Sequence, residues 1–341
     1  MRWLNIALVA VVGCSGGSSN TNDAGSDGAP PADAGLESAP PGDAGVDADG
    51  GAPTAQTLTL GPLTFGTGVE KTQCATMRLG NVGVMHAGAI HTVVTGAWHE
   101  LVIYRSTDTA ESGPADCNPL VGIGADGADA LTVTRRADET LQLPSGDGFT
   151  LQDHQMIRLE LHAVDSGSGV GATVTFDPMT DAFQRETGMI FVGLIDISIP
   201  PGATNAQLHQ VAAAPPIAIG ADLLVMSGHA HELSTDLLVR TVVDGGAPTD
   251  LYESTSFDNP PVTTLAPALA VTAGTAFDIT CTWNNTTQTK AGFGMAEHDE
   301  QCFFRGHYAP STGSRVCINS DQYHADACCP GNALCAQFLG N

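Results

Sequence analysis

Residues 155–162 read QMIRLELH, and this stretch decides the fold class. Apolar and polar residues alternate, so the isoleucine and the two leucines lie on one face of an extended chain, while Arg158, Glu160 and His162 lie on the other. A helix would instead repeat its apolar residues every three or four positions. The stretch therefore predicts a β-strand that packs on a core through one face.

Similar short segments recur along the chain, and turn signals such as SGDG at 145–148, PPG at 200–202 and DGG at 244–246 separate them. No long stretch has a helical period. Further strands are expected at 57–60, 100–105, 172–176, 189–199, 223–226, 236–243 and 277–283. We therefore expect an all-β protein with two tandem jelly-roll or β-sandwich domains, at 57–185 and 186–313.

The composition excludes one class of binding partner and one class of protein. The chain has 341 residues, with 12 Lys+Arg against 37 Asp+Glu and a formal net charge of −25. Nucleic acid is excluded as a partner because its phosphates need basic residues to neutralise them. A hydrophobic share of 42% excludes a wholly disordered chain.

The N-terminus reads as a targeting segment. Arg2 precedes an apolar run at 6–12 that is too short to span a membrane and ends just before Cys14. The sequence around Cys14 resembles a bacterial lipoprotein lipobox, with an ordinary signal peptide as the alternative. The resemblance implies cleavage after residue 13, lipid attachment to Cys14, and a location in the bacterial cell envelope with membrane contact through the lipid alone. Residues 15–56 are rich in Ser, Gly, Ala, Pro and Asp, and a disordered acidic tether is expected there.

Four histidines are candidate metal ligands. His229 and His231 form a His-x-His motif, and on a strand they point to the same face with Cα atoms roughly 6.5–7 Å apart. Two imidazoles at that separation can share a metal, and imidazole suits copper and zinc; two surface histidines are the alternative. His99 and His162 lie on separate predicted strands in the first half. The face that His162 shares with Arg158 and Glu160 favours a solvated histidine.

The order of several motifs resembles that of the copper type II, ascorbate-dependent monooxygenases, the family of peptidylglycine α-hydroxylating monooxygenase and dopamine β-monooxygenase. The match extends from about residue 62 to 317 and is strongest from Gly188 onward. The motifs in order are Cys74, Trp98-His99, Cys117, His162, Gly188-Met189, Ile199-Pro200-Pro201-Gly202, His229-x-His231, Cys281-Thr282-Trp283-Asn284 and Glu300-Gln301-Cys302.

The resemblance implies two jelly-roll domains with one copper each, and hydroxylation of a C–H bond of a small-molecule or peptide substrate with dioxygen and ascorbate or a similar electron donor. His229 and His231 match the catalytic ligands of the dioxygen-binding copper. The family's third ligand is a methionine, and Gln301 occupies its position here. Met295 and His298 are alternative third ligands, because the loop before Cys302 is longer than usual.

The electron-transfer copper would be held by His99 and His162, and Trp98 replaces the first of the family's two adjacent histidines. His86 and His91 precede this site and are considered as compensating ligands. The first functional hypothesis is a copper-dependent monooxygenase. The second is a copper-binding envelope lipoprotein for storage, sensing or delivery without turnover, and the third is a structural β-sandwich without metal.

The family pattern also implies two disulfides, Cys74–Cys117 and Cys281–Cys302. Four further cysteines remain towards the C-terminus, and they define a predicted disulfide-rich tail at 314–341. They are Cys317, Cys328, Cys329 and Cys335. Three connectivities are open to them, and a zinc site with His324 is the alternative.

Overall fold

The computed structural model describes residues 53–120, 128–164, 167–296 and 298–330. The predicted signal segment with Cys14, the tether up to residue 52, and Cys335 lie outside the described residues. Regular structure is almost all β, as the sequence predicts, and the exception among the described residues is one 3-10 turn, η1 (Pro216–Ala218). Within the same residues, no helix is long and apolar enough to span a bilayer.

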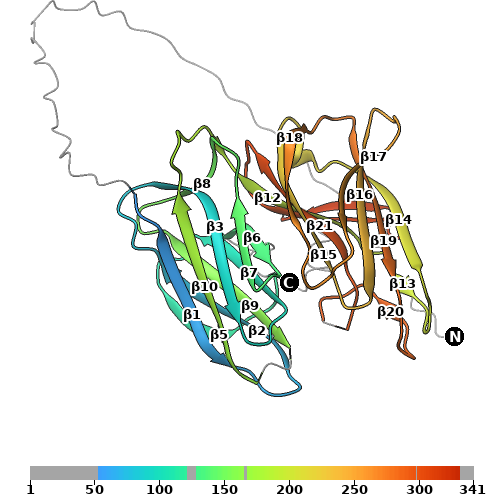
Figure 1. The fold of residues 1–341 in the computed structure, drawn as a ribbon, viewed down its shortest axis with the longest axis horizontal. Coiled ribbons are helices and arrows are strands. Elements are labelled where there is room, and N and C mark those ends of the chain that lie inside the picture. The colour runs from blue at the N-terminus through green and yellow to red at the C-terminus, as the bar shows by residue number, and fades with distance from the viewer. Residues whose placement is uncertain (1–52, 121–127, 165–166, 297, 331–341) are drawn as a thin grey trace, which may run out of the picture. The chain divides into compact units, whose positions relative to one another are not determined.

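The first sandwich consists of two sheets, whose strands appear in blue to green in Figure 1. One sheet has the order β1 (Gln56–Thr64), β10 (Ser168–Pro178), β3 (Met85–Thr95), β8 (Asp147–Leu151) and β11 (Arg185–Glu186), with β7 (Asp138–Gln142) also paired to β3. The other has the order β5 (Ser112–Asp116), β2 (Glu70–Arg78), β9 (Met156–Val164), β4 (Glu100–Ser106) and β6 (Ala128–Thr134).

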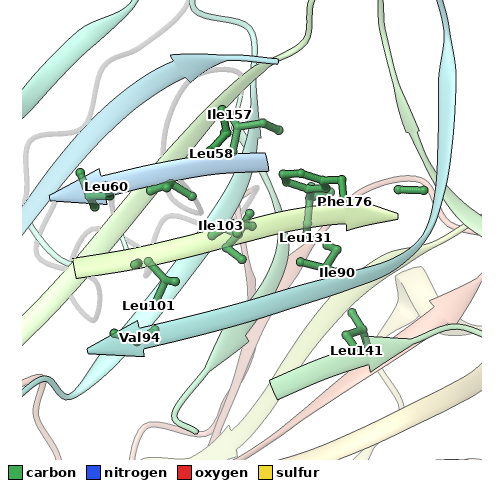
Figure 2. Packing of buried hydrophobic residues seen from close by; sticks show 14 of the residues in the cluster. Leu58, Leu60, Ile90, Val94, Leu101, Ile103, Leu131, Leu141, Ile157 and Phe176 are labelled. Atoms are coloured by element: carbon green, nitrogen blue, oxygen red, sulfur yellow. The ribbon is translucent and has the colours of Figure 1, made fainter. Parts of the chain in front are cut away.

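The core of the first sandwich follows from the alternation along β9. Ile157, Leu159 and Leu161 are fully buried and join the cluster that also contains Leu58 on β1 and Phe176 on β10. Figure 2 shows several of these side chains between the strands. The polar face of β9 is therefore free to point away from this core, and it points towards the second sandwich.

The second sandwich again has two main sheets, in yellow to red in Figure 1. The six-stranded sheet has the order β18 (Val262–Ala270), β15 (Asp222–Ala230), β21 (Cys302–Ala309), β12 (Gly188–Leu194), β22 (Arg315–Ser320) and β23 (Ala325–Cys329). The four-stranded sheet has the order β14 (Ala206–Ala213), β19 (Thr275–Trp283), β16 (Ser234–Val243) and β17 (Thr249–Ser254), and β13 (Ser198–Ile199) pairs with β20 (Ala291–Gly292).

Two details of the second sandwich differ from expectation. The strand expected at 189–199 ends at Leu194, because the carboxylate of Asp196 accepts hydrogen bonds from Ser320 Oγ at 2.5 Å and from the Gln322 amide at 3.1 Å. The described part of the predicted tail is not a separate element, since β22 pairs in parallel with β12 and β23 pairs with β22.

Three disulfides join described cysteines. Cys74 is bonded to Cys117 and Cys281 to Cys302, which are the pairs that the family resemblance implies. The third bond joins Cys317 to Cys328, across the paired strands β22 and β23. These two sulfurs are therefore oxidised and are not available to the alternative zinc site with His324.

The two sandwiches bury a shared cluster between them. Val102 and Tyr104 on β4 pack with Phe191 on β12 and Phe303 on β21, and all four are at most 5% exposed. Polar contacts also cross between the sandwiches: Arg305 pairs with Glu139 at 2.5 Å, and His307 Nε2 donates to the Leu131 carbonyl at 3.0 Å. This packing sets the ends of β4 and β9 against the end of β15.

Candidate metal centre

The four predicted histidine ligands meet in one place. The His99 ring centroid lies 4.8 Å from that of His162, 4.8 Å from that of His231 and 6.4 Å from that of His229. The centroids of His229 and His231 are 5.6 Å apart. The histidines expected at two separate sites, one in each sandwich, therefore lie in one cluster. The physical reason is the packing between the sandwiches, which the family resemblance alone does not reveal.

Strand pairing places each histidine. His99 directly precedes β4, and its amide donates to the His162 carbonyl on β9 at 2.8 Å. In the same pairing Glu100 lies opposite His162, so their side chains share the outer face of this sheet. His229 is the penultimate residue of β15, and His231 is the first residue after this strand ends. The His-x-His spacing thus presents both rings to the first sandwich.

Two of the rings are fixed by hydrogen bonds at one nitrogen. His231 Nδ1 donates to the Asp299 carbonyl at 2.9 Å, and His162 Nε2 lies 2.9 Å from Glu70 Oε1. Such bonds fix the tautomer and leave the other ring nitrogen as an electron-pair donor for a metal. Both nitrogens of His99 are buried and make no hydrogen bond to the described residues. A metal ion bound among the rings would give these buried nitrogens the partner whose absence is otherwise costly.

The electrostatics favour the neutral form of three of the four rings. Burial is the main cause of the lowered pKa values of these three rings. It lowers the pKa of His99 and of His229, and it lowers the pKa of His231 to about 3. The nearby positive charge of Arg135 lowers all three further. Its Nη1 donates at 2.5 Å to the carbonyl of Ala230, between the two histidines of the motif. Neutral imidazole is the form that binds a metal, so no proton has to be displaced near pH 7.

Glu100 lies at the cluster, and the buried Glu160 lies on the same face of this sheet; no sequence motif marks either as a site residue. An oxygen of Glu100 and one nitrogen each of His99 and His162 lie within 4.8 Å of one another, and Glu100 Oε2 is 3.6 Å from His229 Nε2. Glu160 lies on the same face, buried, and accepts a hydrogen bond from Tyr104 at 2.9 Å. Burial raises the pKa of Glu160 to about 7. The alternation along β9 puts Glu160 and His162 on one face, so this signal was present, but their burial does not follow from the local pattern.

The alternative third ligands take different positions. Gln301 is buried, and its Nε2 donates to the Gly294 carbonyl at 2.9 Å and contacts Met295 Sδ at 3.5 Å. Both Gln301 and Met295 line a small enclosed space with His229. The side chain of His298 is 85% exposed and lies near Glu232, so it does not reach the cluster.

The other two histidines considered as ligands also lie elsewhere. The His86 ring stacks on Phe183 with centroids 3.8 Å apart, and His91 Nε2 pairs with Asp138 at 2.9 Å. Neither compensates for Trp98. That tryptophan lines a cavity of ≈ 500 Å³ beside His99.

Residues 185–327 match the family model of the copper type II ascorbate-dependent monooxygenase, C-terminal domain. The matched residues cover the second sandwich. Its His229-x-His231 motif and the Gln301–Cys302 segment both lie within the matched residues. The monooxygenase-type sandwich therefore contributes two of the four clustered rings.

Other comparisons add little. Among curated proteins, none matches the sequence significantly. Among solved structures, the major capsid protein P2 from bacteriophage PM2 matches over 76% of this chain and 100% of its own, at 11% identity and a TM-score of 0.37. A likeness this weak carries no argument about fold or function.

The residues present fit the copper that the family requires. Imidazole suits copper. For metal–nitrogen bonds of about 2.0 Å, rings that share one ion in a tetrahedral arrangement have centroids roughly 5 Å apart. The centroid separations of His99 from His162 and His231 (4.8 Å each), of His229 from His231 (5.6 Å) and of His99 from His229 (6.4 Å) bracket this value.

Proposed function

We propose that this chain is a copper-dependent oxidoreductase of the monooxygenase type, with one copper held jointly by histidines of both sandwiches. The observation that carries the proposal is the convergence of four buried rings, three of them with lowered pKa values, on one cluster. Within it, the two ring nitrogens of His99 make no hydrogen bond to the described residues. The family match of the second sandwich supplies the choice of copper and of a monooxygenase-type reaction.

The reaction class is hydroxylation of a C–H bond. One atom of dioxygen enters the substrate as a hydroxyl group, the other leaves as water, and an ascorbate-type donor supplies the two electrons and two protons. Copper, when bound, supplies the redox chemistry with dioxygen. The chain's own residues hold two of the imidazoles in place through Glu70 and Asp299, and Glu160 can hold a proton within two residues of His162.

A second function is favoured by the enclosure of the cluster. His99, His162, His229 and His231 are all at most 8% exposed. A closed set of four imidazoles resembles sites that keep a metal rather than sites that leave a position open for chemistry. Such a centre suits copper storage, sensing or delivery without turnover.

Oxygen uptake separates the two functions. Copper-loaded protein and a His99→Ala/His231→Ala control are mixed with ascorbate, and oxygen consumption and hydrogen peroxide are followed together. A monooxygenase consumes oxygen beyond the peroxide formed once a substrate is added, and the control does not. If all consumed oxygen appears as peroxide for every substrate tested, the enzyme proposal fails and the copper-binding function stands.

The location of the protein is a separate proposal. The lipobox-like sequence before Cys14 supports a lipid-anchored envelope protein. Incorporation of labelled palmitate into the wild type and not into Cys14→Ser would bear this out, and equal labelling of both would contradict it.

A further inference from the structure

The cavity beside His99 is built from loops of both sandwiches. It has a volume of ≈ 500 Å³, within the usual range for small-molecule sites. Trp98 and Arg136 line it from the first sandwich, and Phe257 lines it from the loop between β17 and β18 of the second. Both aromatic side chains are partly exposed. The cavity therefore offers flat apolar surface next to one of the clustered rings.

Arg136 is one of the two arginines that line this cavity. Its side chain is partly buried, and its Nε is fully buried without a hydrogen-bond partner. Among the described residues, no carboxylate lies within the 4.0 Å of an ion pair from its guanidinium. A buried donor of this kind is costly unless a ligand satisfies it. Its neighbour Arg135 is differently placed, because it donates to Ala230 and lies 5.9 Å over the Phe257 ring.

The acidic residues of the cavity do not neutralise Arg136. Asp138 pairs with His91 at 2.9 Å and has a side chain that is 76% exposed. Asp258 accepts a hydrogen bond from Ser256 at 2.7 Å, and Glu232 is 57% exposed beside His298. These carboxylates lie at the solvent side, where their repulsion of an anion is screened. Within the described part of the chain, the Arg136 guanidinium has no carboxylate at ion-pair distance.

We infer that this cavity binds an organic anion, with its carboxylate on Arg136 and an aromatic or other flat apolar group against Trp98 and Phe257. Guanidinium binds carboxylate through paired charge-assisted hydrogen bonds, and the aromatic rings provide apolar contact. Because the cavity opens on His99, the inference names the substrate class for the proposed oxidoreductase and in that respect rests on the proposed function. Binding itself does not require copper.

The test is a fluorescence titration of the copper-free full-length protein with phenylacetate. The chain has three tryptophans, and of the two that are described Trp98 lines the cavity while Trp283 is 1% exposed. We expect a saturable change in emission with a Kd on the order of 1 mM for a ligand of this size. The change should disappear in Trp98→Phe.

Three comparisons make the charge requirement specific. Arg136→Gln should weaken phenylacetate binding by about tenfold or more, which is the usual contribution of a hydrogen bond to a charged group. The neutral phenylacetamide should bind correspondingly weakly. Arg78→Gln is the matched control, because Arg78 is an exposed arginine on β2 outside the cavity and its replacement should leave binding unchanged.

Unchanged binding in Arg136→Gln, equal binding of the amide, or equal loss in Arg78→Gln would overturn the inference. These results are distinct from a failure of the proposed function. If phenylacetate binds as expected but copper-loaded protein shows no substrate-coupled oxygen uptake, the binding site stands and the oxidoreductase proposal fails.

Discussion

Glu139 and Arg305 form the ion pair that most directly ties the two sandwiches together. Their side chains are 3% and 4% exposed, and the carboxylate and guanidinium are 2.5 Å apart. Glu139→Gln keeps the shape but leaves the Arg305 charge buried without its partner. The remaining hydrogen bond from Arg305 to Thr132, at 3.3 Å, does not replace a carboxylate.

The expected loss of unfolding free energy is about 3 kcal/mol, at the lower end of the usual range for breaking a buried pair, because glutamine keeps one acceptor oxygen. Asp138→Asn is the matched control next to it in the chain. Asp138 is 76% exposed and pairs with His91, so its replacement should cost less than about 1 kcal/mol.

Urea unfolding of the three proteins, followed by circular dichroism, measures both losses. Adding Arg305→Met to Glu139→Gln removes the unpaired charge and should recover part of the stability. If Glu139→Gln costs no more than Asp138→Asn, the pair does not hold the sandwiches together. The reasoning that this interface positions the histidines would then be refuted.

Three further predictions concern other contacts. Removing the Cys281–Cys302 bond by alanine substitution should cost about 3 kcal/mol in urea unfolding, because it closes a chain separation of 21 residues; no loss would contradict this. Burial lowers the pKa of His307 to about 3, so its unfolded form takes up the proton first and stability falls with acidification. His307→Gln should therefore gain about 1.3 kcal/mol relative to the wild type between about pH 7 and about pH 5.5, and a parallel decline of both proteins would argue against a neutral buried His307. Gln301→Met should raise the midpoint potential of bound copper, since a thioether favours Cu(I), and an unchanged potential in spectroelectrochemistry would place Gln301 away from the metal.

The sequence predicts those features that depend on local pattern. Alternation along residues 155–162 correctly separates the core face of β9 from its polar face, and the His-x-His spacing puts both rings on one side of β15. The family resemblance supplied the order of the motifs. These signals come from the local sequence pattern or from the family resemblance, so they do not depend on how the two sandwiches pack together.

The sequence does not predict what the polar face of β9 contacts. Glu160 and His162 read as solvated residues, yet both are at most 3% exposed. Glu160 accepts hydrogen bonds from Tyr104 and from the Leu120 amide, and the His162 ring lies against that of His99. Glu100 could not be recognised as a neighbour of the cluster, since its position depends on the pairing of β4 with β9. Convergence of residues more than 60 positions apart requires the register and the packing of whole sheets.

Copper stoichiometry tests the central claim most directly. Wild-type protein, His99→Ala from the first sandwich and His231→Ala from the second are loaded with copper, freed of excess ion and analysed by mass spectrometry of the metal. The ring centroids of His99 and His231 lie 4.8 Å apart. If both rings bind the same ion, we expect one copper per wild-type chain and loss of that copper in either variant. Two coppers in the wild type, with one retained in each variant, would contradict a shared centre.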